Sequence, residues 1–275
     1  MSGILLHLLP ASLYAALGIH FWRSRNAAPR PRSEPAHPLG ERLLLAIALL
    51  SHGLALQTEL FPDERMRFGF SVAVSMMVWL AVLFYWIETL YTRLDGLQTL
   101  AMPAAAIGAL LPLMWPSQHE ITNAGSMAFR AHFIVAMLAY SLFTLAALHA
   151  LLMALAERQL HNARLTRAFA SLPPLLTMEA LLFRLIGIAF VLLTLTLISG
   201  VAFSESLFGK AFRFDHKTVF AIISWLLFGA LLFGRHAWGW RGRVALRWTL
   251  AGFAALMFAY VGSRFVLEVV LHRVA

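Results

Sequence analysis

The sequence predicts an all-α, polytopic membrane helix bundle of about eight transmembrane helices, and two observations carry this prediction. Of the 275 residues, 60% are hydrophobic and 13% are charged, and the mean hydropathy is +0.75. Soluble domains carry about 25% charged residues, so this chain lacks the polar surface that water requires. Apolar runs of about 20 residues, the length that crosses a bilayer as a helix, recur along the whole chain.

The predicted helices follow these apolar runs. Their bounds are 2–22, 42–60, 69–90, 98–115, 132–156, 178–203, 217–234 and 247–270. The first run has no basic residue before it and "RSRNAAPRPR" after it, which is the reverse of a cleaved signal peptide, so we expect it to remain as a helix. The chain is then a single integral membrane domain over 1–275, with a cytoplasmic Pro/Arg-rich linker over 23–41.

The distribution of basic residues between the loops predicts the orientation. The loops at one end of the bundle, such as 23–42 and 157–177, carry thirteen Lys and Arg residues, and those at the other end carry seven. Because cytoplasmic loops are enriched in Lys and Arg, we expect the richer set in the cytoplasm and both termini on the outer (periplasmic) side of a bacterial inner (plasma) membrane. The same bias accounts for the net charge of +9, so the expected partner is the lipid bilayer and not nucleic acid.

The sequence contains no cysteine. Disulfide exchange, thiolate metal sites and covalent thioether attachment of a cofactor are therefore excluded for this chain. No His-Glu-x-x-His motif, Gly-rich phosphate loop or Ser-His-Asp order occurs in it. We therefore expect a binding protein and not an enzyme.

The stretch "FGKAFRFD", within a predicted outer loop over 204–216, stands between two strongly apolar runs. It combines aromatic, basic and acidic residues: Phe208, Lys210, Phe212, Arg213, Phe214 and Asp215. Rings and cations in this order suit a flat, apolar ring system with carboxylates, through stacking and charge-assisted hydrogen bonds. They equally suit a short re-entrant loop anchored at the membrane interface. On the residues alone both interpretations stay open.

Two histidines flank this loop at the same predicted boundary. His132 stands at the outer start of the fifth predicted helix, and His272 at the outer end of the eighth. Two neutral imidazoles can bind one iron from opposite faces, so heme fits the aromatic loop and the histidines together. A histidine at a helix end is also a common interface residue, which is the competing interpretation. His52 is a second ligand, a helix-to-helix hydrogen bond or a proton site, and the sequence does not choose among these.

The eighth predicted helix carries a polar stripe. Tyr260, Arg264, Glu268 and His272 recur every four residues and so share one face. Charged groups inside a membrane are costly, so we expect the stripe to face the protein interior, with Arg264 and Glu268 as an i,i+4 ion pair. The same charged groups, with His52, support an alternative function as a small-solute or ion transporter or transport regulator.

"FGKAFRFD" resembles the Trp-Gly-x-x-Trp-x-Trp-Asp signature of the heme-handling cytochrome c assembly proteins, the CcsA, CcmC and CcmF family. Gly209 and Asp215 match the signature, and phenylalanine replaces all three tryptophans. "FRLIGIAFVLLTLTLISG" before the loop and "DHKTVFAIISWLLFGALL" after it resemble the family's flanking helices. The resemblance is strongest from about 178 to 272, and within the family it looks closest to the short, eight-helix YpjD-type inner-membrane branch.

The resemblance implies a non-catalytic carrier or chaperone that binds b-type, non-covalent heme at its outer face during cytochrome c assembly. It places His132 and His272 at the two iron-ligand positions, and Phe233 where the family often has a second membrane-embedded histidine. The implied partners are heme, other cytochrome assembly proteins and an apocytochrome. The predicted heme-binding residues are His132, His272, Phe208, Gly209, Lys210, Phe212, Arg213, Phe214, Asp215, Tyr260 and Arg264. A structural assembly factor that has lost heme is a further alternative, which the three tryptophan replacements favour.

Overall fold

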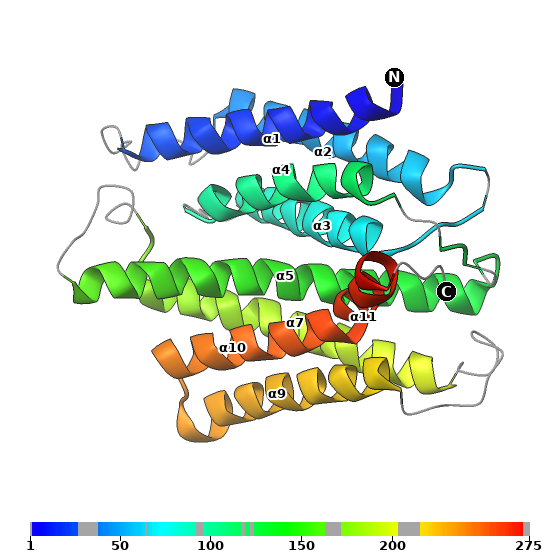
Figure 1. Cartoon of the computed structure of the whole chain (residues 1–275). Helices are drawn as coiled ribbons and strands as arrows, with labels where there is room; N and C mark the ends of the chain where they lie inside the picture. The colour runs from blue at the N-terminus through cyan, green and yellow to red at the C-terminus, as the bar shows by residue number, and fades with distance from the viewer. Residues whose placement is uncertain are drawn as a thin grey trace.

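The computed structural model in Figure 1 describes residues 2–26, 38–63, 65–91, 96–116, 119–121, 124–162, 172–202 and 215–271. Its long helices are α1 (Ser2–Asn26), α2 (Leu39–Leu60), α3 (Phe70–Tyr91), α4 (Gln98–Met114), α5 (Met127–His161), α7 (Leu175–Ala202), α9 (His216–Trp238) and α10 (Gly242–Met257). The chain continues from α10 through the π-helical turn η1 (Phe258–Gly262), the short α11 (Ser263–Phe265) and a second π-helical turn η2 (Val266–Val270). The all-α prediction is confirmed.

Within the described ranges, seven helices are long and apolar enough to cross a membrane, counting α10 together with its continuation as Gly242–Val270. The remaining apolar helix, α4, has 17 residues, which at 1.5 Å per residue is about 25 Å. That length is slightly less than the hydrocarbon core of a bilayer, which is about 30 Å thick. All eight predicted apolar segments are therefore helices in the part of the chain that the structure describes.

Helix ends differ from the sequence prediction where capping residues act. α5 begins at Met127 and not at 132, because Ser126 caps it by accepting a 3.1 Å hydrogen bond from the amide of Phe129. α9 ends later and α10 begins earlier than predicted, so fewer residues separate these two helices. Gly239, with φ of 67°, ends α9 in the left-handed conformation that glycine adopts without strain.

The helices pack as a stack of pairs. Figure 1 shows α1 with α2 at one edge, then α3 with α4, α5 with α7, and α9 with α10 at the other edge. α5 lies at the centre, in contact with α3, α7 and α10. In its most apolar stretch of 18 residues, 72% of the residues are buried inside the protein. The first four helices form one half of this stack, and the other four form the second half. Contacts between α3 and α5 join the two halves.

One end of the bundle carries a separate hydrophobic cluster. We call this end the outer end, after the predicted orientation; it lies on the right in Figure 1 and includes the start of α1 and all of η2. The cluster is built from Leu56, Leu60, Met66, Phe68, Val72, Ala73, Phe129 and Met137. Above it, the segments 61–68 and 119–121 pair through backbone hydrogen bonds from Phe68 to His119 (2.9 Å) and from Ile121 to Met66 (2.8 Å). The outer end is thereby closed by backbone pairing between two loops.

The packing of α10 against α9 generates a prediction for Gly252. A Cβ atom at this position would lie 2.9 to 3.1 Å from three ring carbons of Phe228, which is buried and stacked on Phe143 at 3.9 Å between centroids. We expect Gly252→Ala to destabilise the protein by about 1–3 kcal/mol, because the ring has no space to move. Thermal unfolding in detergent measures this.

Gly187→Ala on α7 is the matched control, since a Cβ atom there meets no atom within 4 Å. Alanine stabilises a helix interior by up to about 1 kcal/mol relative to glycine, so this variant should be as stable as the wild type or more stable. Equal unfolding temperatures for the two variants would contradict the close α9–α10 packing.

Candidate functional site

His132 lies in the second turn of α5 at the outer end, and Ser199 of α7 fixes its ring. The Nδ1 atom is 2.8 Å from Ser199 Oγ, and that hydroxyl donates its own hydrogen to the carbonyl of Thr196 at 3.1 Å. Ser199 must therefore accept from His132, so Nδ1 carries the hydrogen and the lone pair lies on Nε2. This is the tautomer of an imidazole that binds a metal through Nε2, with its other nitrogen held by a hydrogen bond.

Aromatic rings connect the region of His132 to the C-terminal helix. Phe133 stacks on Phe129 at 5.8 Å and meets Phe68 edge-on at 4.9 Å. Phe68 in turn lies 5.5 Å from the ring of Tyr260. The outer end thus contains a continuous aromatic wall from α5 to η1, in which the sequence interpretation singled out Tyr260 but none of the three phenylalanines.

Tyr260 and Arg264 both face the interior of the outer end. The Tyr260 hydroxyl donates to the carbonyl of Phe68 at 3.3 Å, and the guanidinium of Arg264 lies over the Tyr260 ring at 6.0 Å. Arg264 is 9% exposed, and its Nη2 donates to His119 Nε2 at 2.8 Å. Its Nε atom is buried without a hydrogen-bond partner in the described part of the chain. The predicted inward orientation of the polar stripe is confirmed for Arg264.

The predicted i,i+4 ion pair between Arg264 and Glu268 is wrong. Glu268 instead accepts a hydrogen bond from the backbone amide of Phe70 at 3.1 Å, at the start of α3. Each side chain has found a partner on another segment, with Arg264 directed to His119. The π-helical turns η1 and η2 on either side of Arg264 change the helix geometry on which the i,i+4 expectation depended. π-helical turns in α-helices occur frequently at functional sites.

A second cation lies close to Arg264. Lys217, in the first turn of α9, is near enough that the two positive charges repel each other, while the carboxylate of Asp215 attracts it. Positive charges that repel and a buried guanidinium N–H without an acceptor together favour an anion in this position. The sequence predicts this role for Lys210, Arg213 and Lys217, the basic residues in and just after "FGKAFRFD", and the structure adds Arg264 beside Lys217.

Asp215 is the N-cap of α9. Its side chain accepts from the amide of Thr218 at 2.9 Å and from the Thr218 hydroxyl at 3.0 Å. Burial raises the pKa of the Asp215 carboxyl, but the hydrogen bonds from Thr218 and the neighbouring charges of Lys217 and His216 outweigh it and hold the pKa below its ordinary value of 3.8. The aspartate that ends the signature stretch thus fixes the point where the outer loop enters α9.

Several predicted site residues lie outside the described residues. These are Phe208, Gly209, Lys210, Phe212, Arg213, Phe214 and His272. Their roles stay predictions. His272 follows directly after Leu271, the last described residue, and Asp215 directly follows the loop.

The membrane-embedded histidine His52 lies in the other half of the protein. It is fully buried on α2, bonds through Nε2 to the hydroxyl of Ser75 on α3 at 2.9 Å, and has the ring of Tyr14 edge-on at 5.7 Å. Phe233, at the position where the family often has the partner histidine, is 60% exposed on α9. His52 and Phe233 therefore belong to different packing environments.

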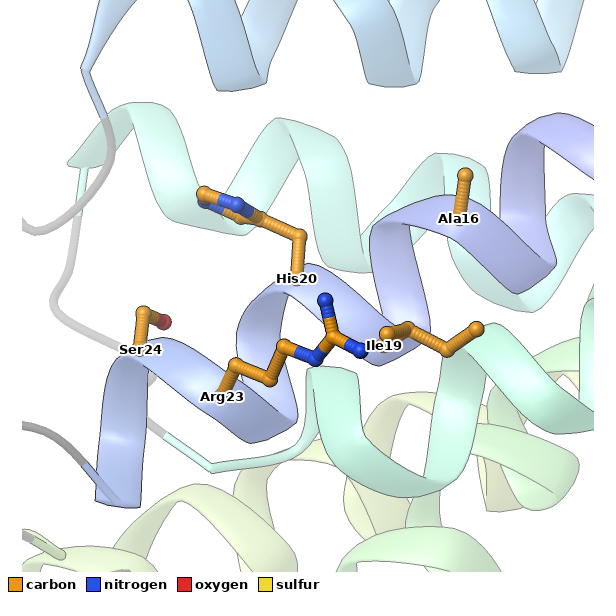
Figure 2. Close-up of a pocket in the computed structure, with 5 residues that line it drawn as sticks. All are labelled: Ala16, Ile19, His20, Arg23 and Ser24. Atoms are coloured by element: carbon orange, nitrogen blue, oxygen red, sulfur yellow. The ribbon is translucent and has the colours of Figure 1, made fainter.

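An open depression runs along α1 toward its inner end. Figure 2 shows the residues that line it, Ala16, Ile19, His20, Arg23 and Ser24, all from α1. It lies at the opposite end of α1 from the outer-end cluster. The candidate site is therefore the group of residues around His132, Tyr260 and Arg264, and not this depression.

Sequence reasoning missed three residues of the outer end. Ser199 sets the tautomer of His132, His119 accepts from Arg264, and Phe68 joins the aromatic wall to Tyr260. His119 was visible as one of several outer loop histidines. For Ser199 and Phe68 no local pattern distinguishes them, because their partners are 67 and 192 residues away.

Comparisons with known proteins show which family the chain resembles. A family model described as "Cytochrome C assembly protein" matches residues 41–271, which run from the first turn of α2 through Leu271. The chain is 31% identical over 232 residues to "Inner membrane protein YpjD" of Escherichia coli K12, and the similarity covers 82% of this chain and 85% of that protein.

Two further relatives differ in how much they cover. An "Uncharacterized 28.8 kDa protein in nifR3-like 5'region" of Azospirillum brasilense is 30% identical over 211 residues, covering 75% of this chain and 78% of the relative. "Cytochrome c biogenesis protein CcsA" of Gloeobacter violaceus is 32% identical over 92 residues, covering 34% of this chain and 27% of the relative. No solved structure matches the chain.

The capping role of Asp215 generates a prediction. Asp215→Ala should destabilise the protein by about 1 kcal/mol, because the first turn of α9 loses its side-chain acceptor. Because folding lowers the pKa of this carboxyl, its stabilising charge is present above pH 3.8 and is lost as the pH falls through the folded-state pKa. Thermal unfolding of wild type and variant at a series of acidic pH values measures both effects.

Asp215→Asn is the control, since asparagine also caps helices but does not titrate. It should retain most of the stability at neutral pH and lose the acid dependence that belongs to this site. An Asn variant as unstable as the Ala variant would contradict the capping role.

Proposed function

The chain belongs to the cytochrome c assembly protein family, and from this membership and the geometry of its outer end we propose that it binds heme non-covalently there as a carrier or chaperone. Family membership supports a role in cytochrome c biogenesis. With its seven helices of spanning length and its similarity to an inner membrane protein, the chain is a multi-pass inner-membrane protein. The observation that carries the proposal is the 2.8 Å contact between His132 Nδ1 and Ser199 Oγ, from which we infer the tautomer that an iron ligand requires.

His132 and His272 are the proposed iron ligands. His132 meets the chemical requirement, because its Nδ1–H is occupied by Ser199 and its lone pair is on Nε2. His272 is two residues beyond the end of η2 in the sequence. His132 lies near the beginning of the second half of the chain, and His272 lies near its end. Binding of both histidines to one iron would therefore connect α5 to the C-terminal helix.

Basic residues of the outer end are proposed to bind the heme carboxylates. Arg264 has a buried Nε–H without an acceptor, and Lys217 adds a second cation beside it. A carboxylate between them would supply the missing acceptor and reduce the repulsion of the two charges. Lys210 and Arg213 of the signature loop are the proposed further contacts.

Rings on two sides support an apolar, planar ligand. Phe68, Phe133 and Tyr260 form the wall that the fold provides. Phe208, Phe212 and Phe214 are proposed to stack on the opposite side, at the positions where the family has tryptophan, with Gly209 allowing close approach of the loop. Asp215 anchors the loop where it meets α9.

The absence of cysteine from the sequence fits a carrier. A protein without thiols cannot hold heme through thioether bonds to its own chain. Bound heme would supply an iron centre, and the protein's own residues would hold and orient it. We propose that this chain presents heme at the outer face to other assembly proteins or an apocytochrome as a non-catalytic carrier.

Heme loading tests the proposal directly. Detergent-purified protein reconstituted with heme should show the absorption spectrum of a low-spin, bis-histidine b-type heme in the oxidised and reduced states. His132→Ala and His272→Ala should each remove this spectrum or weaken heme binding by more than about tenfold, since each removes one axial ligand. His149→Ala is a control of the same chemistry, because His149 Nε2 donates to the carbonyl of Met178 at 2.9 Å in the buried core.

Colourless protein after loading, with an unchanged unfolding temperature, would overturn the proposal and favour the alternative of an assembly factor without heme. Ion or solute flux in proteoliposomes that Glu268→Gln abolishes, with no heme present, would instead favour transport. Arg264 and Glu268 are directed to different partners, and His52 is in the other half of the bundle, so these three residues are not connected by hydrogen bonds among the described residues.

The contact between Ser199 and His132 gives a sharper prediction. Ser199→Ala should weaken heme binding by about 10–100-fold without removing either ligand, because it frees the ring orientation and tautomer of His132. Equilibrium titration with heme measures the loss. Ser199→Thr retains a hydroxyl at the same position and should restore most of the affinity; an Ala variant with wild-type affinity would contradict the orienting role.

A further inference from the structure

We propose that His7 on α1 and Glu59 on α2 form a proton-binding site at the outer end, and that the bound proton attaches α1 to the rest of the bundle. His7 is 2% exposed. Its Nδ1 is 2.9 Å from the carbonyl oxygen of Ala109 on α4, and its Nε2 is 3.1 Å from Oε1 of Glu59. One imidazole therefore joins three helices.

The two contacts fix the number of protons. The carbonyl of Ala109 can only accept, so Nδ1 of His7 must carry a hydrogen. Oε1 of an ionised Glu59 can also only accept, so a second hydrogen must lie between it and Nε2. A neutral histidine beside an ionised glutamate has a single N–H and cannot make both bonds. The pair therefore holds one additional proton, as imidazolium and carboxylate or as neutral imidazole and carboxylic acid.

The surroundings connect this proton to the outer aqueous phase. The side chain of Glu59 is 29% exposed, while that of His7 is 3% exposed, so exchange takes place on the Glu59 side. The ionisable groups around the pair are few. α4 has none in its sequence, α2 contributes His52, and α1 contributes Tyr14.

His52 and Tyr14 are the ionisable side chains near the His7–Glu59 pair. A positive charge on His7 opposes a charge on His52, which is bonded to the hydroxyl of Ser75 on α3. The Nδ1 of His52 and the hydroxyl of Tyr14 are both buried without hydrogen-bond partners in the described structure. Among the described residues, Glu59 is the carboxylate in contact with His7, so it is the acidic partner on which the site depends.

Loss of the proton would release α1. Without it, the lone pair of Nε2 faces a lone pair of the carboxylate, and two acceptors cannot form a hydrogen bond. The family match begins at residue 41, after α1, so the proton controls attachment of a helix that the family model does not include. The equilibrium for detachment should shift about tenfold per pH unit between the pH at which the detached His7 loses its proton and the higher pH at which the attached pair loses it, since the two states differ by one proton in that range.

The opposite end of α1 contains a matched control pair. His20 contacts Oε1 of Glu41 at 3.0 Å, also between α1 and α2. Its side chain is 51% exposed (Figure 2), and Nε2 makes its one hydrogen bond in the described structure. A neutral imidazole satisfies that single contact without an additional proton. The two pairs thus share their chemistry and helices but differ in whether a proton is required.

The first test counts the proton in the full-length protein in lipid nanodiscs at neutral pH. Nitrogen NMR of ¹⁵N-histidine-labelled protein and infrared spectroscopy should show one of two states. Either both ring nitrogens of His7 are protonated, or Glu59 shows a carboxylic acid band; His7→Gln and Glu59→Gln assign these signals by removing them. A bare nitrogen on His7 together with an ionised Glu59 would overturn the proposal.

The second test measures attachment of α1. The chain has no cysteine, so spin labels can be placed specifically at Leu5→Cys on α1 and Ile107→Cys on α4, where the side chains are 66% and 63% exposed. As the pH rises above about 6.5, the pKa of an unperturbed histidine, a population with a longer label distance should appear and grow about tenfold relative to the attached one per pH unit, until the attached pair itself loses its proton.

Two variants decide the origin of this pH dependence. Glu59→Gln should keep the short distance at all pH values, because its amide donates to the neutral Nε2 of His7 without an added proton. Glu41→Gln, in the control pair, should leave the wild-type pH dependence unchanged. A wild-type distance that is constant with pH, or an equal pH dependence in Glu59→Gln, would contradict the proposed site.

Discussion

The structure depends on one constraint: a polar side chain inside an apolar bundle must find its partner within the protein, because lipid offers none. The chain meets it by bonds between helices. Glu179 of α7 pairs with Arg235 of α9 at 2.6 Å, His7 of α1 with Glu59 of α2, and His52 of α2 with Ser75 of α3. Each such bond also selects which helices lie side by side, so polar pairing and helix packing specify the same arrangement.

The pairing of buried polar side chains differs between the two halves of the bundle. In the first four helices, His7 joins α1 to α2 and α4, and His52 joins α2 to α3, although His52 Nδ1 and the Tyr14 hydroxyl have no hydrogen-bond partner in the described structure. At the outer end of the second half, the buried atoms without partners belong to charged groups. Arg264 Nε and Glu268 Oε1 are buried without partners in the described structure, and Lys217 adds a further charge nearby. A buried charged group without a partner is a place where a ligand would be stabilising.

The π-helical turns of the C-terminal helix also serve the pairing of buried polar side chains with partners on other segments. They lie on either side of Arg264, where side chains must reach His119 and the start of α3 across the outer end. A regular α-helix would favour pairing of Arg264 and Glu268 with each other. The observed geometry instead directs the two charges to different segments, so the C-terminal helix holds the two outer loops in place and keeps the guanidinium inside the candidate site.

The sequence by itself determined the membrane class, the eight apolar helices and the family, because hydropathy and a local signature are properties of neighbouring residues. It also indicated His132 and Arg264 as site residues. Only the tertiary structure decided their partners. Ser199 lies 67 residues from His132, and His119 lies 145 residues from Arg264. The error about Arg264 and Glu268 has the same origin, since spacing along one helix describes what two side chains can reach, but the lowest free energy belongs to the partner that packing brings to them.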